Sequence, residues 1–105
     1  MVIKIIGIEW DDGNLVKCQK HGVPLEETEE VLYNPNICIE PDFVHSTEEE
    51  RLWAIGRNAK GRGVFVAFTR KHRFDGLWLR PISARYMHTK EVRYYETKTT
   101  SFQNG

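Results

Sequence analysis

The hydrophobic pattern at the start of the chain predicts a strand followed by a helix. Ile3–Ile8 is rich in isoleucine and otherwise mostly apolar, which is typical of a β-strand. A helix is expected across Asn14–Lys20, because Asp11 or Asp12 can cap its beginning and Gly22 can end it.

A second helix is expected to begin at Pro24, since proline fits the first position of a helix. Its early turns carry glutamates at positions 26, 27, 29 and 30, and negative charge there suits the positive end of the helix dipole. Asn34–Asn36 is expected to break this helix. A short strand should follow at Ile37–Glu40, and a polar loop at Pro41–Glu50.

The second half of the chain has the hydrophobic pattern of β-strands. Strands are predicted at Leu52–Gly56, Val64–Thr69 and Leu77–Ser83. Because Val64–Thr69 is a nearly continuous apolar run, it is expected at the centre of the sheet with both faces covered. Asn58–Gly63 is expected to form a turn. Arg70–Gly76 is expected to form a longer loop that ends in an Asp-Gly pair typical of hairpins.

The end of the chain completes an α+β pattern. Pro81 cannot donate a hydrogen bond to a neighbouring strand, which places one side of its strand near a sheet edge. A short C-terminal helix is expected from Thr89 to Glu96, with a polar tail at 97–105. We therefore expect one compact domain at residues 1–96, with an N-terminal strand and two helices packed on a mainly antiparallel sheet. Trp10, Trp53 and Trp78 are expected in its core.

Charge is divided unevenly along the chain. The 105 residues hold fifteen basic and fifteen acidic side chains, so the formal net charge is zero. Residues 1–50 contain twelve acidic and three basic side chains, whereas residues 51–105 contain twelve basic and three acidic ones. A clustered basic surface attracts polyanions even when the total charge is neutral, so a nucleic-acid partner stays open.

Several classes of protein are unlike this sequence. The longest apolar run, Val64–Phe68, is far shorter than the roughly 18 residues of a membrane helix. The apolar start of the chain is too short for a signal peptide and leads directly into acidic residues. Without a secretion signal, Cys18 and Cys38 are expected to be reduced thiols. We therefore expect a soluble, cytoplasmic domain that does not bind membranes.

No metal or cofactor is expected either. Cys18 and His21 are three positions apart, but no second closely spaced pair completes a four-ligand zinc site. The sequence also has no phosphate-binding loop, no GxSxG motif and no dinucleotide-binding glycine pattern.

Arginine, histidine and tyrosine accumulate instead. Arginine forks match phosphate oxygens in two-point contacts, and aromatic rings stack on unpaired bases. RNA cleavage without a metal needs a base for the 2′-hydroxyl proton, cations for the phosphate and an acid for the leaving oxygen. These residue types can supply all three roles, although a solvated basic face would have the same composition. The residues concerned are Arg57, Arg62, Arg70, Arg73, Arg80, Arg85, Arg93, His21, His72, His88, Tyr86, Tyr94 and Tyr95.

Three of these residues leave two interpretations open. Arg80 lies in the middle of a predicted strand, so it either pairs with an N-terminal carboxylate or binds phosphate. Arg85 follows the predicted end of that strand, a place where functional residues are often presented. His21 precedes Gly22 at a helix end, where it either interacts with the helix dipole or takes part in catalysis.

Five blocks of sequence, in order, resemble the BrnT family of toxins. The resemblance covers nearly the whole chain up to Glu96. It rests on Glu9-Trp10-Asp11 followed by Lys20-His21-Gly22-Val23 and Glu26-Glu27, on Glu49-Glu50-Arg51 with Ile55-Gly56-Arg57, on Val66-Ala67-Phe68-Thr69, on Ile82-Ser83-Ala84-Arg85, and on the ending Glu91 to Glu96.

The resemblance implies a RelE-like α+β fold and a metal-independent endoribonuclease that cleaves RNA and inhibits translation. It also implies neutralisation by a BrnA-type ribbon-helix-helix antitoxin, in a complex that can bind operator DNA. The residues that match the family's blocks are Lys20, His21, Arg57 and Arg85, with Arg80 and Tyr95 in second rank. Lys20 or His21 would transfer protons and the arginines would hold phosphate.

Two other functions remain open. In the first, the basic face holds RNA or an antitoxin segment without cleaving it, and the active site is degenerate. In the second, the chain serves mainly to dock its antitoxin. RNA binding that weakens with salt but yields no cleavage products would indicate the first.

Overall fold

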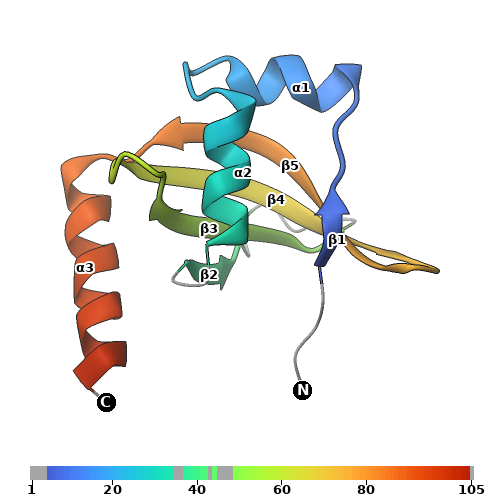
Figure 1. Ribbon diagram of the computed structural model, residues 1–105. Coiled ribbons are helices and arrows are strands. Elements are labelled where there is room, and N and C mark those ends of the chain that lie inside the picture. The colour runs from blue at the N-terminus through green and yellow to red at the C-terminus, as the bar shows by residue number, and fades with distance from the viewer. Residues whose placement is uncertain (1–4, 35–36, 43, 45–48, 105) are drawn as a thin grey trace.

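The computed structural model describes residues 5–34, 37–42, 44 and 49–104, and it describes side chains as far as residue 97. Within these residues the chain forms three helices and five strands (Figure 1). The strands are β1 (Ile5–Ile8), β2 (Cys38–Pro41), β3 (Arg51–Arg57), β4 (Gly63–Arg73) and β5 (Gly76–Tyr86). The helices are α1 (Asp12–Gln19), α2 (Leu25–Tyr33) and α3 (Thr89–Asn104). None of these helices is long and apolar enough to cross a membrane.

The strands form one sheet in the order β1-β5-β4-β3-β2. Only β1 runs parallel to its neighbour, β5, while the other three pairs are antiparallel. The helix α2 crosses β3 and β4 on one face, and α1 lies beside it near β5 (Figure 1). This arrangement confirms the predicted α+β fold and its mainly antiparallel sheet.

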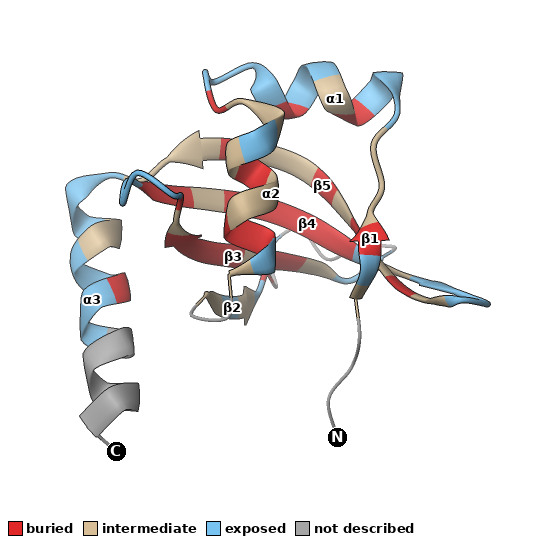
Figure 2. Ribbon diagram, viewed as in Figure 1, coloured by how far each residue is buried: buried red, intermediate tan, exposed pale blue. Residues whose placement is uncertain are grey.

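The core lies between α2 and the sheet. In neighbouring strands, Ala54, Val66 and Ala84 stand side by side in one row, and Leu52 and Phe68 stand in the next. All five are buried, and they pack with Val31 and Leu32 of α2 in the same hydrophobic cluster (Figure 2). Because side chains alternate along a strand, the residues between these positions point to the opposite face. That second face carries the candidate site.

The start of α1 is fixed by two polar side chains. Asp11 caps the helix, and its carboxylate accepts hydrogen bonds from the backbone N–H groups of Gly13 and Asn14. The buried Asn14 amide donates to the carbonyl of Glu9 at 2.9 Å and to that of Pro81 at 3.0 Å. One side chain thereby joins the segment after β1, the helix α1 and the middle of β5.

The expected loop at Arg70–Gly76 is wrong. The two strands extend into it, because β4 ends only at Arg73 and β5 already begins at Gly76, so that Phe74 and Asp75 alone form the turn. Gly76 has φ of 136°, a conformation that side chains disfavour, and an added Cβ would meet Ile6 at 2.6 Å. The hairpin protrudes from the sheet because β4 and β5 stay paired to Arg73 and Gly76, beyond the point where β3 pairs with β4 (Figure 1).

The last strand and the C-terminal helix are both longer than predicted. Arg85 lies inside β5, which ends at Tyr86 rather than at Ser83, because its partner β4 continues alongside. The helix α3 runs to Asn104 instead of ending at Glu96, since residues 97–104 include no glycine or proline that would stop it. Pro81 lies in an inner strand, where a β-bulge beside it and the end of β1 remove the need for its N–H.

The tryptophans were expected in the core, but all three are only half-buried.

The small side chain of Cys18 is fully buried. Burial raises the pKa of its thiol to about 11, so the thiol stays protonated at neutral pH.

Candidate functional site

The face of the sheet opposite α2 presents Arg57 and Arg85. An added Cβ on Gly56 would meet Val31 of α2, so the next residue, Arg57, points to the other face. Ala84 belongs to the core cluster, and Arg85 therefore also points away from α2. We call this side of the sheet the open face.

Arg85 is held by a two-point ion pair. Its guanidinium donates hydrogen bonds of 2.7 and 2.6 Å to the two carboxylate oxygens of Glu91 on α3. It also lies 4.4 Å from the centre of the Phe65 ring. The hydrogen bond from Arg85 is the main cause that lowers the pKa of Glu91, and the same contact raises the pKa of Arg85.

This ion pair predicts an acid-side change in stability. The folded-state pKa of Glu91 lies below its ordinary value of 4.5, so the pair stabilises the fold at neutral pH. That contribution is lost as the pH falls through the lowered pKa. We expect Glu91→Gln to show a smaller loss of unfolding free energy between pH 6 and pH 3 than the wild type, as measured by urea titration. An equal loss in both proteins would contradict the assignment.

Arg57 is held at the beginning of the β3–β4 turn. It donates to the Gly61 carbonyl at 2.8 Å and to the Glu96 carboxylate at 2.9 Å, and its guanidinium lies 5.8 Å from the Tyr95 ring. Tyr95 itself is buried, with 5% of its surface exposed. Glu91 and Glu96, both on α3, thus form ion pairs with Arg85 and Arg57, the two arginines that were predicted first as phosphate ligands.

Lys20 and His21 lie on the helix side of the molecule, in the turn between α1 and α2, and both are exposed. In the part of the chain that the structure describes, neither side chain makes a hydrogen bond or an ion pair. Glu27, in the first turn of α2, accepts a hydrogen bond from Tyr86 at the end of β5. The turn with Lys20 and His21 therefore lies toward the same end of the sheet as Arg57 and Arg85.

Arg80 is separate from the other predicted site residues. Its guanidinium donates to Asp11 at 2.8 and 3.2 Å and to Glu9 at 3.3 Å. These contacts match the ion-pair interpretation, because they hold the capping residue of α1 against β5. The contact with Asp11 raises the pKa of Arg80 and is the largest cause that lowers the pKa of Asp11.

The folded chain cancels much of the charge asymmetry seen along the sequence. Carboxylates of the first half pair with cations of the second half, in the pairs Glu9–Arg73, Glu49–Lys71, Glu50–Arg70 and Asp11–Arg80. Among the described residues, the lysines and arginines with no carboxylate partner are Lys17, Lys20, Lys60, Arg62, Lys90 and Arg93. Four of these six belong to the β3–β4 turn and the first turns of α3, next to Arg57 and Arg85.

The sequence did not single out a polar cluster at this end of the sheet. Glu27 accepts hydrogen bonds from Tyr86 and from the Asn58 amide, and the Arg62 guanidinium lies 3.4 Å from the centre of the Tyr86 ring. Burial is the largest cause that raises the pKa of the Tyr86 hydroxyl, and the contact with Glu27 adds to it. The glutamate run on α2 was visible in the sequence, but its partners across the sheet were not.

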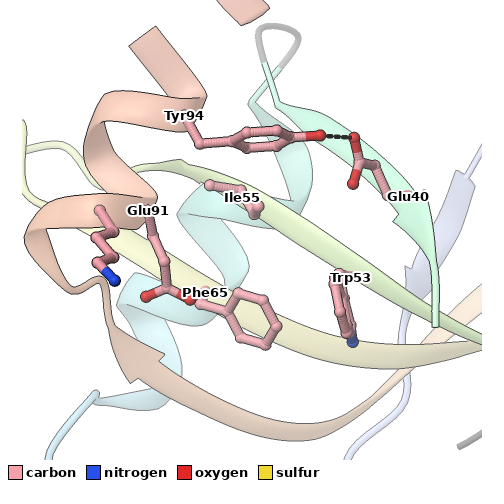
Figure 3. A pocket seen from close by; sticks show the side chains of 7 residues that line it. Glu40, Trp53, Ile55, Phe65, Glu91 and Tyr94 are labelled. Atoms are coloured by element: carbon pink, nitrogen blue, oxygen red, sulfur yellow. Dashed lines mark hydrogen bonds between the residues drawn. The ribbon is translucent and has the colours of Figure 1, made fainter. Parts of the chain in front are cut away.

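A small hollow lies on the open face beside Arg85. Its aromatic walls are Trp53 of β3, Phe65 of β4 and Tyr94 of α3, with Ile55 as an apolar floor (Figure 3). The rings of Trp53 and Phe65 lie 5.4 Å apart and are inclined by 54°. Within the described residues, no group of three or more histidines, cysteines and carboxylates is placed to hold a metal ion.

The structure is thus a small α+β domain with cationic side chains gathered at one end of its sheet. The family model of the BrnT ribonuclease toxin of type II toxin–antitoxin systems matches residues 10–91. The chain therefore belongs to this family of ribonuclease toxins, as the sequence blocks indicated. A comparison with curated proteins gives no match.

Proposed function

We propose that the chain is a metal-independent endoribonuclease that cleaves RNA in the cytoplasm and thereby inhibits translation. The observation that supports this most directly is a grouping of cations at one end of the sheet. Arg57 and Arg85 lie there with Lys60, Lys90 and Arg93, which have no carboxylate partner within the described part of the chain. Positive charge gathered there attracts the RNA backbone and offsets the negative charge of the phosphate.

Cleavage at this site would follow the chemistry of the 2′-hydroxyl. A base removes the proton from that hydroxyl, and its oxygen forms a bond to the adjacent phosphorus. The bond from phosphorus to the 5′-oxygen breaks, and an acid gives that oxygen a proton. The products are a 2′,3′-cyclic phosphate and a 5′-hydroxyl. Arg57 and Arg85 stabilise the extra negative charge in the transition state.

Lys20 and His21 are the proposed proton-transfer groups. They lie on the helix side of the same end of the sheet, whereas Arg57 and Arg85 lie on the open face. The phosphate that is cleaved would therefore have to lie at the rim between the two faces, because both sets of residues act on the same phosphate. Arg80 is assigned a positioning role, because Asp11 and Glu9 hold its guanidinium. Tyr95 supports Arg57 from α3 with its buried ring.

An antitoxin partner follows from membership of a toxin–antitoxin family. We propose that the partner is a BrnA-type ribbon-helix-helix protein and that operator DNA is bound only through the complex. In the test, the chain is expressed alone in a bacterial host while growth and total RNA are followed together. Growth arrest with RNA loss, both reversed by co-expression of the neighbouring small gene, is the expected result. Normal growth with soluble protein and intact RNA would contradict the proposal.

Metal independence is tested separately with purified protein. Labelled RNA should be cut equally well with and without EDTA, and the products should carry cyclic phosphate ends. Loss of cleavage in EDTA, restored by added Mg²⁺, would contradict a metal-free mechanism.

One observation favours a second function, in which the basic end binds RNA without cleaving it. Carboxylates of α3 occupy both Arg57 and Arg85, as expected if the arginines mainly fasten that helix. Salt-dependent binding of RNA with no cleavage products would indicate this function.

The same ion pairs predict the effect of freeing one arginine. Glu91→Gln keeps the oxygen that accepts from the His88 backbone N–H, but it removes the charge that competes for Arg85. Because such pairs are worth up to about 1 kcal/mol, we expect RNA to bind up to about fivefold more tightly. The measurement is a binding titration with an RNA whose 2′-hydroxyls are methylated. Glu50→Gln, which frees Arg70 with the same change of charge, is the control. An equal gain in the control would show that only net charge matters.

A further inference from the structure

The hollow on the open face has the form of a site for a flat ring. Three aromatic side chains from three different elements, Trp53, Phe65 and Tyr94, surround it (Figure 3). Its volume is about 210 Å³, below the roughly 300–1,000 Å³ of pockets that hold drug-sized molecules. The space therefore suits a single small ring system better than a peptide segment or a large cofactor.

Trp53 differs from the other two tryptophans in its indole N–H. The N–H of Trp10 is donated to Glu29 and that of Trp78 to Asp75, each at 3.0 Å. Among the described residues, no acceptor receives the N–H of Trp53. An indole beside a hollow, with its donor unused, can bind a ligand that has both an aromatic face and hydrogen-bond acceptors.

The hollow is lined by the carboxylates of Glu40 and Glu91 as well as by Lys90. Because Glu91 is already bound to Arg85, a ligand phosphate is favoured only at the edge where Arg85 and Lys90 stand. Arg85 lies over Phe65, which forms one wall, and its guanidinium thus stands at the edge of the hollow. Lys90, which has no carboxylate partner among the described residues, also lines it. A phosphate at Arg85 would exchange with the Glu91 carboxylate, which presents the same two-oxygen geometry.

We propose that this hollow binds one unpaired base of single-stranded RNA, stacked against Trp53, while Arg85 holds the adjoining phosphate. The proposal rests on the RNA-directed function above and adds a base-binding subsite to it. Every nucleobase has an aromatic face and ring or carbonyl acceptors, so stacking here needs no particular sequence. Duplex RNA hides its base faces, and the site therefore selects single strands.

The test uses full-length protein and a short RNA with methylated 2′-hydroxyls, which cannot be cleaved through the 2′-oxygen. A second RNA of the same length and charge lacks one base. Trp53→Ala removes the proposed stacking platform, and we expect it to weaken binding of the complete RNA about tenfold. Tyr94→Ala removes an exposed wall of the hollow without touching the core, and a smaller loss is expected. Trp10→Ala is the matched control, because its indole is bound to Glu29.

Each outcome has a defined meaning. The proposal is supported if wild-type protein binds the RNA that lacks a base about tenfold more weakly than the complete RNA, while Trp53→Ala binds the two RNAs equally. Equal binding of the complete RNA by wild-type, Trp53→Ala and Tyr94→Ala proteins overturns the base subsite and leaves the RNA-directed function standing. Failure of the wild-type protein to bind either RNA overturns both.

Discussion

Replacing Arg57 and Arg85 together with alanine is expected to relieve growth arrest and to lower RNA cleavage at least about 100-fold. Removing a single hydrogen-bond donor that stabilises transition-state charge typically lowers kcat about 100-fold or more, and this variant removes two guanidinium groups. Both lie on the open face, where their ion pairs with Glu96 and Glu91 are partly exposed and add little to stability. The double variant should therefore stay folded, which circular dichroism and thermal unfolding can check.

The matched control for this experiment is the double variant Arg70→Ala and Arg73→Ala. It removes the same charge from the same sheet, and these arginines also pair with carboxylates, but they lie in the protruding hairpin. We expect the control to remain toxic. A folded Arg57→Ala and Arg85→Ala protein that is fully toxic would show that the assigned phosphate ligands are wrong. Equal loss in both double variants would indicate that only overall charge is needed.

The largest expected loss of stability comes from Asn14→Ala. The variant leaves the part-buried carbonyl of Glu9 and the buried carbonyl of Pro81 without the amide that donates to them. It also removes the oxygen that accepts from the Asp11 backbone N–H. We expect the free energy of unfolding to fall by about 2–4 kcal/mol, out of the roughly 5–15 kcal/mol typical of a whole domain.

Val16→Ala is the control for the Asn14 variant. Val16 lies on the same helix but is 73% exposed, so its replacement should change the free energy of unfolding by no more than about 0.5 kcal/mol. Urea unfolding of both variants gives the comparison. If Asn14→Ala is as stable as Val16→Ala, the Asn14 hydrogen bonds do not hold the sheet and helix together.

The sequence predicted the existence and order of the elements because their signals are local. The apolar run at Val64–Thr69 is an inner strand, and Asp11 caps α1, as its residue type suggested. The extension of both strands of the protruding hairpin was not predictable locally. Its charged residues resemble a loop, but they pair with β5 as strand, and Glu9, Glu49 and Glu50 from distant parts of the chain pair with their cations.

The candidate site was predictable by residue type but not by grouping. Guanidinium groups that match phosphate were visible in the sequence, and Arg57 and Arg85 do share one face. The partners of Arg80 could be identified only from the fold, because they lie about 70 positions away in the sequence. The hollow at Trp53 could not be predicted from the sequence either. Its walls come from three elements, and the half-exposure of Trp53 depends on which face α2 covers.

The pairing of β1 with β5 also constrains how the protein is made. Ile5 meets Leu77, so the first strand has no partner until nearly three quarters of the chain has been synthesised. At typical bacterial speeds of about 5–20 residues per second, this wait lasts roughly 4–14 s. During it the acidic half emerges from the ribosome without its basic complement. A ribosome that stops before residue 77 therefore releases a fragment that lacks the strand it needs, and such a fragment cannot form the arginine site.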